Sequence, residues 1–395
     1  MRRARAIDGW LLAVPRWQQY IVISLTIAFM AWQALPNVPR EYIDFSRIPA
    51  LQGIRQPDRF GPDTVSENYV ARVVLNDPWD MYTKDKVPQT EREAALWSKA
   101  ASGPYPPAVL LAEAAIYRLG EWTGLRFYGG ILLLAGVFLF LSLKYFLATR
   151  WYLFPALYLN FSYLGYRFVY VQDCTYLVVL VVAISALWMA RARRPGAHAL
   201  MALAIVMKLT PLYYAKNVFT MPRRSAVLFV AILVAGLALP YFVWDNYLYI
   251  FAFHETLKGN WPGMVAALGY GIPFAACLWY VEHKLGFDLE DRVGWGMVPV
   301  AMMMAMKMNV PRHLLLALLV PDKRGLRNLA VAFALGLQIL LPGLIRFGSV
   351  LSILTVLMFF ILFYYLHQIG WPTVRDDFRH PVRTFRTLLI PRKAD

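Results

Sequence analysis

The amino-acid sequence predicts an all-α polytopic integral membrane protein. Three observations predict it: long apolar runs recur along the 395-residue chain, charged residues make up only 16% of it, and basic residues gather between the runs. A soluble domain usually has about 25% charged residues, and its surface helices are amphipathic. Because a bilayer is crossed by about 20 apolar residues in a helix, we expect a bundle of roughly 10–12 helices, some of them broken.

Eight apolar runs are expected to span the membrane as helices. Their ends carry Trp, Tyr, Lys or Arg, the side chains that anchor helices at membrane interfaces. The expected spans are residues 17–35, 127–147, 151–169, 174–190, 225–243, 263–283, 327–346 and 348–368. The first run follows basic residues and has no small-x-small cleavage pattern, so we expect a retained span and not a removed signal peptide.

Three further apolar segments are interrupted by polar residues. Segment 105–121 begins with a Tyr-Pro-Pro sequence, 196–221 is interrupted at 208–211, and 296–321 is interrupted at 307–313. Basic clusters at 191–194 and 223–224 flank the second segment, which predicts a broken or re-entrant pair. The same holds for the third segment if residues 323–327 are cytoplasmic. Irregular backbone at membrane depth persists only where protein or a wet cavity satisfies it, and a lysine there usually has a function. The alternative is a proline kink with a snorkelling lysine.

The placement of Lys and Arg orients the chain. By the positive-inside rule, both termini are cytoplasmic, and residues 36–104 lie on the periplasmic or exterior side of a cytoplasmic (inner) membrane. We expect one domain over residues 1–370, followed by a basic tail, 371–395, on the cytoplasmic membrane surface. The net charge of +16 is distributed among the segments between spans, which does not favour a nucleic-acid partner.

The long outer segment is expected to carry short amphipathic helices. Within residues 63–76, DTVSENYVARVVLN, the side chains of Val65, Tyr69 and Val73 share one helical face. Asp63 stands directly before this face, at the N-cap position. From spacing alone, Asp63 is either a helix cap or a carboxylate placed for chemistry, and caps are the commoner case.

A series of short motifs runs through residues 60–325. In chain order these are Asp63, Ala71-Arg72, Asp77-Pro78, Tyr105-Pro106-Pro107, Gln172-Asp173, Lys208-Leu209-Thr210-Pro211, and His313 at the start of an apolar run that ends at Pro321. Their order and spacing resemble the membrane-embedded GT-C glycosyltransferases, and more narrowly glycosyltransferase family 87, which uses polyprenyl-phosphate sugars. The chain departs from the family pattern at Val171 and Asp173 beside the glutamine, and at Ser66 and Glu67 after the aspartate.

The resemblance implies an inverting glycosyltransferase. Its donor would be a polyprenyl-phosphate sugar, carrying mannose or another hexose or pentose, and its acceptor a hydroxyl of a glycolipid or polysaccharide. The resemblance gives Asp63 the role of catalytic base. A carboxylate within hydrogen-bond reach takes the proton of the attacking hydroxyl. One carboxylate is enough here, because phosphate is a good leaving group, whereas glycoside hydrolases use a second carboxyl as acid.

Negative charge grows on the departing lipid phosphate, so the reaction needs cations fixed beside it. The candidate donor phosphate-binding residues are Lys208, Arg312 and His313, with Lys307 behind them. A buried lysine offsets its desolvation only beside an anion, and a lipid phosphate would be that anion. The alternative for His313 is an ordinary histidine at the membrane interface, although its basic neighbour at a helix break favours function.

Candidates for binding the sugar or the acceptor are Tyr69, Tyr105, Gln172, Asp173 and His254. The tyrosines either stack on a sugar face or belong to the aromatic belts of a membrane protein. Asp173 either binds sugar, acts as a second base or pairs with a nearby cation. His254 lies in a polar loop, where an ordinary solvated histidine is the favoured alternative.

No cofactor is expected, and the resemblance implies a metal-independent enzyme. A divalent metal, for which Glu67, Asp77 and Asp80 offer carboxylates, is the less favoured alternative. The acidic residues of the outer segment include no tight Asp-x-Asp pair, and Cys174 and Cys277 lie far apart in apolar sequence. A donor without a diphosphate also has less need of Mg²⁺. The expected partners are the lipid-linked donor, the acceptor and membrane lipids.

Two other classes of protein compete with the transferase. A polytopic transporter or a lipid-linked-sugar flippase also uses broken helices with charges near the midplane. Transporters often have two corresponding halves, and no corresponding segments are evident here. A binding or scaffold protein would account for the polar outer segment but not for Lys208 and Lys307 inside apolar segments.

Overall fold

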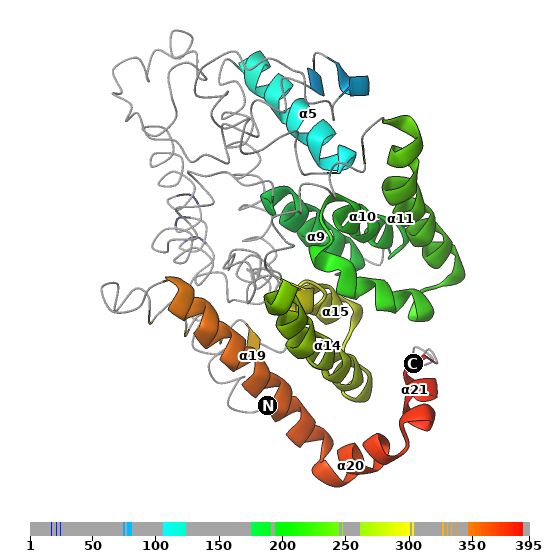
Figure 1. The fold of residues 1–395 in the computed structure, drawn as a ribbon, viewed down its shortest axis with the longest axis vertical. Coiled ribbons are helices and arrows are strands. Elements are labelled where there is room, and N and C mark those ends of the chain that lie inside the picture. The colour runs from blue at the N-terminus through cyan, green and yellow to red at the C-terminus, as the bar shows by residue number, and fades with distance from the viewer. Residues whose placement is uncertain are drawn as a thin grey trace. The chain divides into compact units, whose positions relative to one another are not determined.

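The described part of the chain is helical. The computed structural model describes residues 74–75, 77–80, 106–123, 175–190, 194–244, 247, 261–300, 302–303, 326–327 and 347–389, and single positions at 17, 21, 24, 330, 333 and 337. Among these residues no strand occurs (Figure 1). The all-α prediction is confirmed for them, while the expected runs at 127–147 and 151–169 lie outside them.

Four of the expected spans are helices close to the predicted bounds: α9 (Thr175–Ala190), α11 (Arg223–Val243), α14 (Trp261–Lys284) and α19 (Phe347–Ile369). Two stretches of the described chain are long and apolar enough to cross a membrane, Arg223–Val243 and Ser352–Ile369, with mean hydropathies of 2.6 and 1.8. Only 11% and 28% of their residues are buried. By length and composition alone, these helices are a weak indication of membrane association.

The chain divides into two compact units. The first consists of Met1–Leu180, Val206–Lys208 and Val234–Gly259, and the second consists of Val181–Ile205, Leu209–Leu233 and Asn260–Asp395. Several helices continue from one unit to the other along the chain. The expected division at residue 370 stays a prediction.

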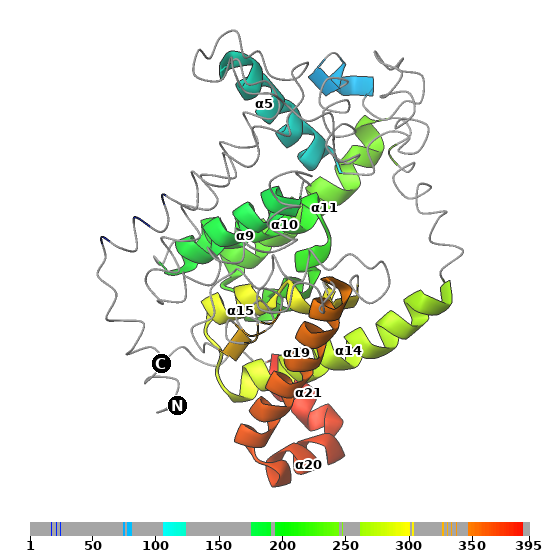
Figure 2. The same ribbon diagram turned by 90° about the vertical axis from the view of Figure 1, so that its left-hand side faces the viewer.

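In the first unit, the interrupted segment at 105–121 forms α5 (Pro107–Thr123). The helix begins at Pro107 because a proline lacks the N–H that the first helical position leaves unpaired. Leu110 and Ala114, one turn apart on α5, pack against Val74 and Tyr247 in a small buried cluster. A short 3-10 helix, η4 (Pro78–Asp80), lies beside α5 (Figures 1 and 2). Residues from three parts of the chain thus meet on one face of α5.

The predicted break in segment 196–221 is confirmed. α10 (Arg194–Met207) ends directly before Lys208, and a 3-10 helix, η6 (Thr210–Thr220), begins two residues later. Pro211 lies in the first turn of η6, where it removes no hydrogen bond. Its ring disfavours the helical conformation at the residue before it, which helps to end the preceding helix.

The fold of η6 follows from its period. A 3-10 helix has about three residues per turn, so every third side chain points the same way, and runs longer than about four residues are uncommon. η6 is 11 residues long, and Pro211, Tyr214 and Asn217 form one buried face. Tyr213 and Lys216 lie on the next face, where both are largely covered. This sorting places the two faces of one short element against different neighbours.

In the second unit, α14 packs against α19, with the rings of Phe274 and Phe359 edge to face at 5.2 Å. Gly370 ends α19 with a φ of +92°, a conformation that an L-residue adopts only with strain. The chain then forms α20 (Trp371–Arg379) and α21 (Pro381–Leu389), and α21 returns to α14. Figures 1 and 2 show this turn at the end of α19.

Candidate functional site

Lys208 is the predicted site residue that falls in the described part of the chain. It is half-buried and stands in the connection between α10 and η6. The last carbonyls of a helix carry partial negative charge, so a lysine directly after α10 is favourably placed as a simple helix-terminal cation. The structure therefore places Lys208 at the expected break and leaves its chemical role as a prediction.

The other predicted site residues lie outside the described residues. They are Asp63, Tyr69, Tyr105, Gln172, Asp173, His254, Lys307, Arg312 and His313. The predicted amphipathic helix around residues 63–76 is described only at Val74 and Leu75, which are helical. The roles assigned to these residues stay predictions.

The Asp77-Pro78 motif forms a defined turn. The side chain of Asp77 accepts a hydrogen bond of 3.2 Å from the backbone N–H of Trp79, as an aspartate does at the start of a helix. The indole N–H of Trp244, directly after α11, donates to the carbonyl of Pro78 at 2.8 Å. The first bond closes the turn at residues 77–79, and the second joins that turn to the end of a helix more than 160 residues later in the chain.

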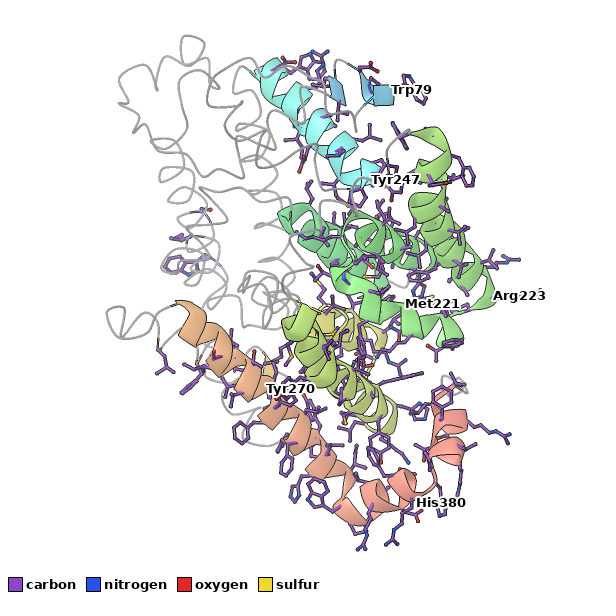
Figure 3. All side chains as sticks on the ribbon, in the orientation of Figure 1. Trp79, Met221, Arg223, Tyr247, Tyr270 and His380 are labelled. Carbon is purple, nitrogen blue, oxygen red and sulfur yellow. The ribbon has the colours of Figure 1, made fainter. Side chains whose placement is uncertain are left out.

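The residues that adjoin this turn pack against α5 through apolar contacts. Val74 and Tyr247 are buried against Leu110 and Ala114, with Leu75 and Trp244 packed at the edge. Trp79 points away from this cluster and is exposed, as Figure 3 shows. Because α5 begins at the Pro106-Pro107 motif, two motifs of the series that carries the family resemblance belong to one packed arrangement. The sequence predicted their order but could not predict this contact.

A second polar cluster lies in the other unit and was missed by the sequence analysis. Lys216 of η6 forms an ion pair with Glu282 of α14, and the two side chains are 9% and 1% exposed. The ammonium of Lys216 also lies 4.0 Å from the centre of the Tyr213 ring. The Tyr213 hydroxyl donates to the carbonyl of Ala275, two turns before Glu282 on the same face of α14, at 3.2 Å. These contacts join η6 to α14 through Lys216, Glu282 and Tyr213.

The next face of η6 makes a different set of polar contacts. The hydroxyl of Tyr214 lies 3.2 Å from Nδ1 of His198 on α10 and 3.7 Å from the sulfur of Met189 on α9. The side-chain amide of Asn217 donates to the carbonyl of Tyr214 at 2.9 Å. The side chains of Tyr214, Asn217 and His198 are buried, so these bonds satisfy polar groups that would otherwise be costly to bury.

Another buried cation, Arg327, lies against α15 (Leu289–Trp295). The guanidinium carbon of Arg327 is 5.5 Å from the Trp295 ring, and Arg327 is fully buried. A Cβ on Gly294 would come within 2.8 Å of that carbon, so a glycine is needed where the guanidinium approaches the helix backbone. Asp288 caps α15 by accepting a 2.9 Å bond from the N–H of Asp291.

The buried polar contacts of the described residues concentrate charge in two places. The clusters around η6 and α15 hold cations and a carboxylate inside apolar helices, where electrostatic interactions are strong. In membrane proteins such groups face a pathway, a bound anion or each other. Among the described residues, no group of three His, Cys, Asp or Glu side chains is placed to hold a metal ion. The prediction that no metal takes part stays a prediction.

No family model matches this chain, and neither the curated proteins nor the solved structures contain a match to it.

Proposed function

We propose that the chain is an inverting glycosyltransferase that moves a sugar from a polyprenyl-phosphate donor to a hydroxyl of a glycolipid or polysaccharide, on the outer face of the cytoplasmic membrane. The single observation that carries the proposal is the packing beside the Asp77-Pro78 turn. Val74, three residues before the turn, is buried against α5, which begins at Pro107, and Trp244 at the edge of the same cluster donates to the Pro78 carbonyl. The neighbourhoods of two motifs thus adjoin one cluster, both from an ordered series that resembles glycosyltransferase family 87. At a third motif of the series, Lys208–Pro211, α10 ends and η6 begins.

In this proposal the chain works as a polytopic membrane enzyme. The apolar, exposed surfaces of α11 and the Ser352–Ile369 stretch of α19 contact lipid, and the donor's polyprenyl chain lies along such helices. Both termini are cytoplasmic. A cysteine at position 85, made by Asp85→Cys, is therefore labelled by an impermeant reagent added outside intact cells. Labelling from the cytoplasmic side alone would contradict this orientation.

Asp63 is the proposed base. It takes the proton of the acceptor hydroxyl as that oxygen attacks the anomeric carbon, while the bond from this carbon to the lipid phosphate breaks and the phosphate leaves as an anion. Lys208, Arg312 and His313, with Lys307 behind them, neutralise the charge that grows on the phosphate. Tyr69, Tyr105, Gln172, Asp173 and His254 are the proposed contacts to sugar and acceptor.

The first test is transfer by purified protein. The full chain is incubated with a radiolabelled polyprenyl-phosphate sugar and lipids extracted from the membranes of the cells that produce it, and the labelled product is separated by chromatography. Replacing a general base lowers the rate by about 10²–10⁴-fold, so Asp63→Asn should lose transfer by that factor. Asp376→Asn, which changes an exposed aspartate of α20, is the matched control. Equal transfer by wild type and Asp63→Asn would refute the assignment.

The second test addresses the lipid phosphate. Lys208→Met removes one cation, and we expect weaker donor binding and slower transfer, because a charge-assisted contact to phosphate is lost. Lys208→Arg keeps the charge and should keep most of the activity. If the methionine variant binds the donor as well as wild type, Lys208 is a helix-terminal cation and not part of the donor site.

One observation favours the competing class, a transporter or flippase without transferase activity. The Lys216–Glu282 pair is buried between η6 and α14, as charged pairs along substrate pathways of transporters are. Liposomes that contain the protein and a fluorescent polyprenyl-phosphate sugar separate the two functions. Lipid exchange between leaflets that requires Lys216 and Glu282, with no product formed from an added acceptor, would favour the transporter.

A further inference from the structure

The two C-terminal helices have different inner and outer faces. On the inner face, Val374 of α20 and Leu388 of α21 are buried, and Asp377 accepts a 2.7 Å bond from the Tyr280 hydroxyl. Asp377 also pairs with Lys284 at 2.6 Å. These contacts fix the two helices, which we name the C-terminal hairpin (Trp371–Leu389), on the end of α14.

The outer face of the C-terminal hairpin is basic. At about 100° per residue, Arg375 and Arg379 lie opposite the buried Val374 and the partly buried Asp377 on α20. Arg383 and Arg386 lie opposite the buried Leu388 on α21 in the same way. All four arginines are exposed, against one exposed aspartate, Asp376, among the residues of the hairpin.

This arrangement of charge is unfavourable for an isolated helix. Residues three or four apart on one helix are neighbours, and like charges at that spacing destabilise it. Each helix of the hairpin holds one such arginine pair. An anionic surface close to the arginines removes this repulsion, and guanidinium groups bind phosphate oxygens in a bidentate manner. The charge pattern thus fits a surface that displays many phosphates.

Large apolar side chains flank the arginines. Val382 is 70% exposed, Phe378 61% and Trp371 44%. The Trp371 ring lies 5.1 Å from Phe363 of α19, which is itself exposed in the apolar stretch long enough to cross a membrane. Trp at the end of such a stretch is typical of the membrane–water interface. The apolar surface of α19 therefore continues into the hairpin at the level where headgroups would lie.

From the charge of the outer face and its continuity with α19, we propose that the C-terminal hairpin is an anionic-lipid-binding element: Arg375, Arg379, Arg383 and Arg386 bind phosphates of the cytoplasmic leaflet that α19 spans, while Trp371 and Val382 enter the headgroup–acyl boundary. The proposal rests on the membrane embedding in the proposed function. The sequence alone predicts only a basic tail at the membrane surface. The proposal names the face of the hairpin that binds and the ligand, the phosphates of anionic lipids.

The test uses the full chain in lipid nanodiscs. Val382→Cys, with Cys174 and Cys277 replaced by serine, is labelled with a fluorophore, and quenching by lipids brominated high on their acyl chains is measured. Each basic side chain near an anionic leaflet strengthens binding about fivefold. We expect strong quenching in discs that contain phosphatidylglycerol, and loss of most of it in the variant with all four arginines changed to glutamine. The four Arg→Lys changes keep the charge and should keep the quenching.

Three outcomes would overturn the proposal. The first is no quenching at position 382 in anionic discs. The second is quenching that is as strong in discs of phosphatidylcholine alone, and in the four-glutamine variant, as it is with the four arginines in anionic discs. The third is protection of the label from iodide in detergent together with a dimeric complex, which would assign the face to a second copy of the chain. Arg118→Gln, an exposed arginine of α5 paired with Glu121, is the control for charge elsewhere.

A label on α11 separates this proposal from the proposed function. Val234 is exposed in the middle of the apolar stretch Arg223–Val243, so a fluorophore there should be quenched by lipids brominated near the bilayer centre. Quenching at 234 without quenching at 382 rejects only the lipid-binding hairpin. No quenching at 234 rejects the membrane embedding itself, and sugar transfer measured in the same discs tests the catalytic assignment independently of either label.

Discussion

Two ion pairs extend from the same helix, α14, into different surroundings. Glu282 pairs with Lys216 where the side chains are 1% and 9% exposed. Lys284 pairs with Asp377 where they are 25% and 20% exposed. The charges are alike, but only the second pair keeps contact with the solvent. Because desolvation and screening depend on burial, we expect burial, and not the presence of an ion pair, to decide how strongly each contact holds its neighbouring element.

The two environments predict different energies. Removing one partner of a buried pair leaves an uncompensated charge, which typically costs about 3–5 kcal/mol, whereas an exposed pair contributes about 0–1 kcal/mol. η6 therefore depends on its charged contact far more than α20 does. If the comparison is right, variants of the two pairs on one helix should differ severalfold in their effect on unfolding.

The largest expected effect is that of Lys216→Met. It leaves Glu282 buried without its cation, so we expect the free energy of unfolding to fall by about 3–5 kcal/mol. The half-buried thiol of Cys277, on the same helix, reports the loss of structure when a thiol-reactive dye is added during heating. Lys284→Met is the matched control on the exposed pair and should shift the melting temperature much less.

A double variant sharpens this prediction. Replacing both Lys216 and Glu282 by methionine removes the charges together, and replacing a buried pair by apolar side chains is often neutral or stabilising. We expect the double variant to unfold near the wild-type temperature although Lys216→Met alone does not. A double variant as unstable as the single one would mean that the packing of the lysine stem, and not its charge, holds η6 in place.

The next largest effect is expected at Gly370. Its φ of +92° turns the chain from α19 into α20, and a Cβ there would meet no atom within 4 Å, so the strain of Gly370→Ala is purely that of the backbone. Such a conformation costs an L-residue about 1–2 kcal/mol. We expect increased proteolysis between α19 and α20. Gly269→Ala, where a Cβ also meets nothing, is the matched control inside a helix. Equal proteolysis of both variants would contradict the prediction.

Much of the fold of the described residues could be predicted from hydrophobic runs and from proline. The ends of α9, α11, α14 and α19 fall within a few residues of the expected bounds, because long apolar runs have few alternatives to a helix. The break before Pro211 was likewise predictable, because proline restricts the residue before it. The 3-10 character of η6 was not, since it depends on tertiary contacts of its two buried faces.

The candidate sites were less predictable. Lys208 attracted attention because a Lys-x-x-Pro pattern is visible in the sequence, but Lys216 looked like an ordinary polar residue near the end of an apolar segment. Its partner, Glu282, follows after another long helix, and no local spacing relates the two. The signal that was available is the charge of Glu282 itself, a carboxylate inside a predicted span, which indicates that a buried cation lies near it.

The smallest effect, and the one with a pH signature, is expected at Asp377. Partial burial raises the pKa of its carboxyl, but hydrogen bonds from Lys284 and Tyr280 and the positive charges of Lys284 and Arg383 outweigh it, so the pKa lies below its ordinary value. Because the pKa is depressed, the charged carboxylate stabilises the contact fully at a pH above its ordinary pKa of about 4. This contribution is lost as the pH falls through the lower, folded-state pKa.

A spin label on the exposed Thr373 of α20 measures this directly. In the wild type, the label should be immobile at neutral pH and become mobile as Asp377 is protonated, whereas Asp377→Asn should have the mobile spectrum throughout, with a loss of about 1 kcal/mol in the contact. Asp376→Asn controls for the exposed Asp376–His380 pair, whose 3.9 Å separation makes it weak. An identical pH response in Asp377→Asn and wild type would show that Val374 and Leu388 hold the hairpin on α14 without the ion pair, and the contrast with Lys216–Glu282 would then be greater than proposed.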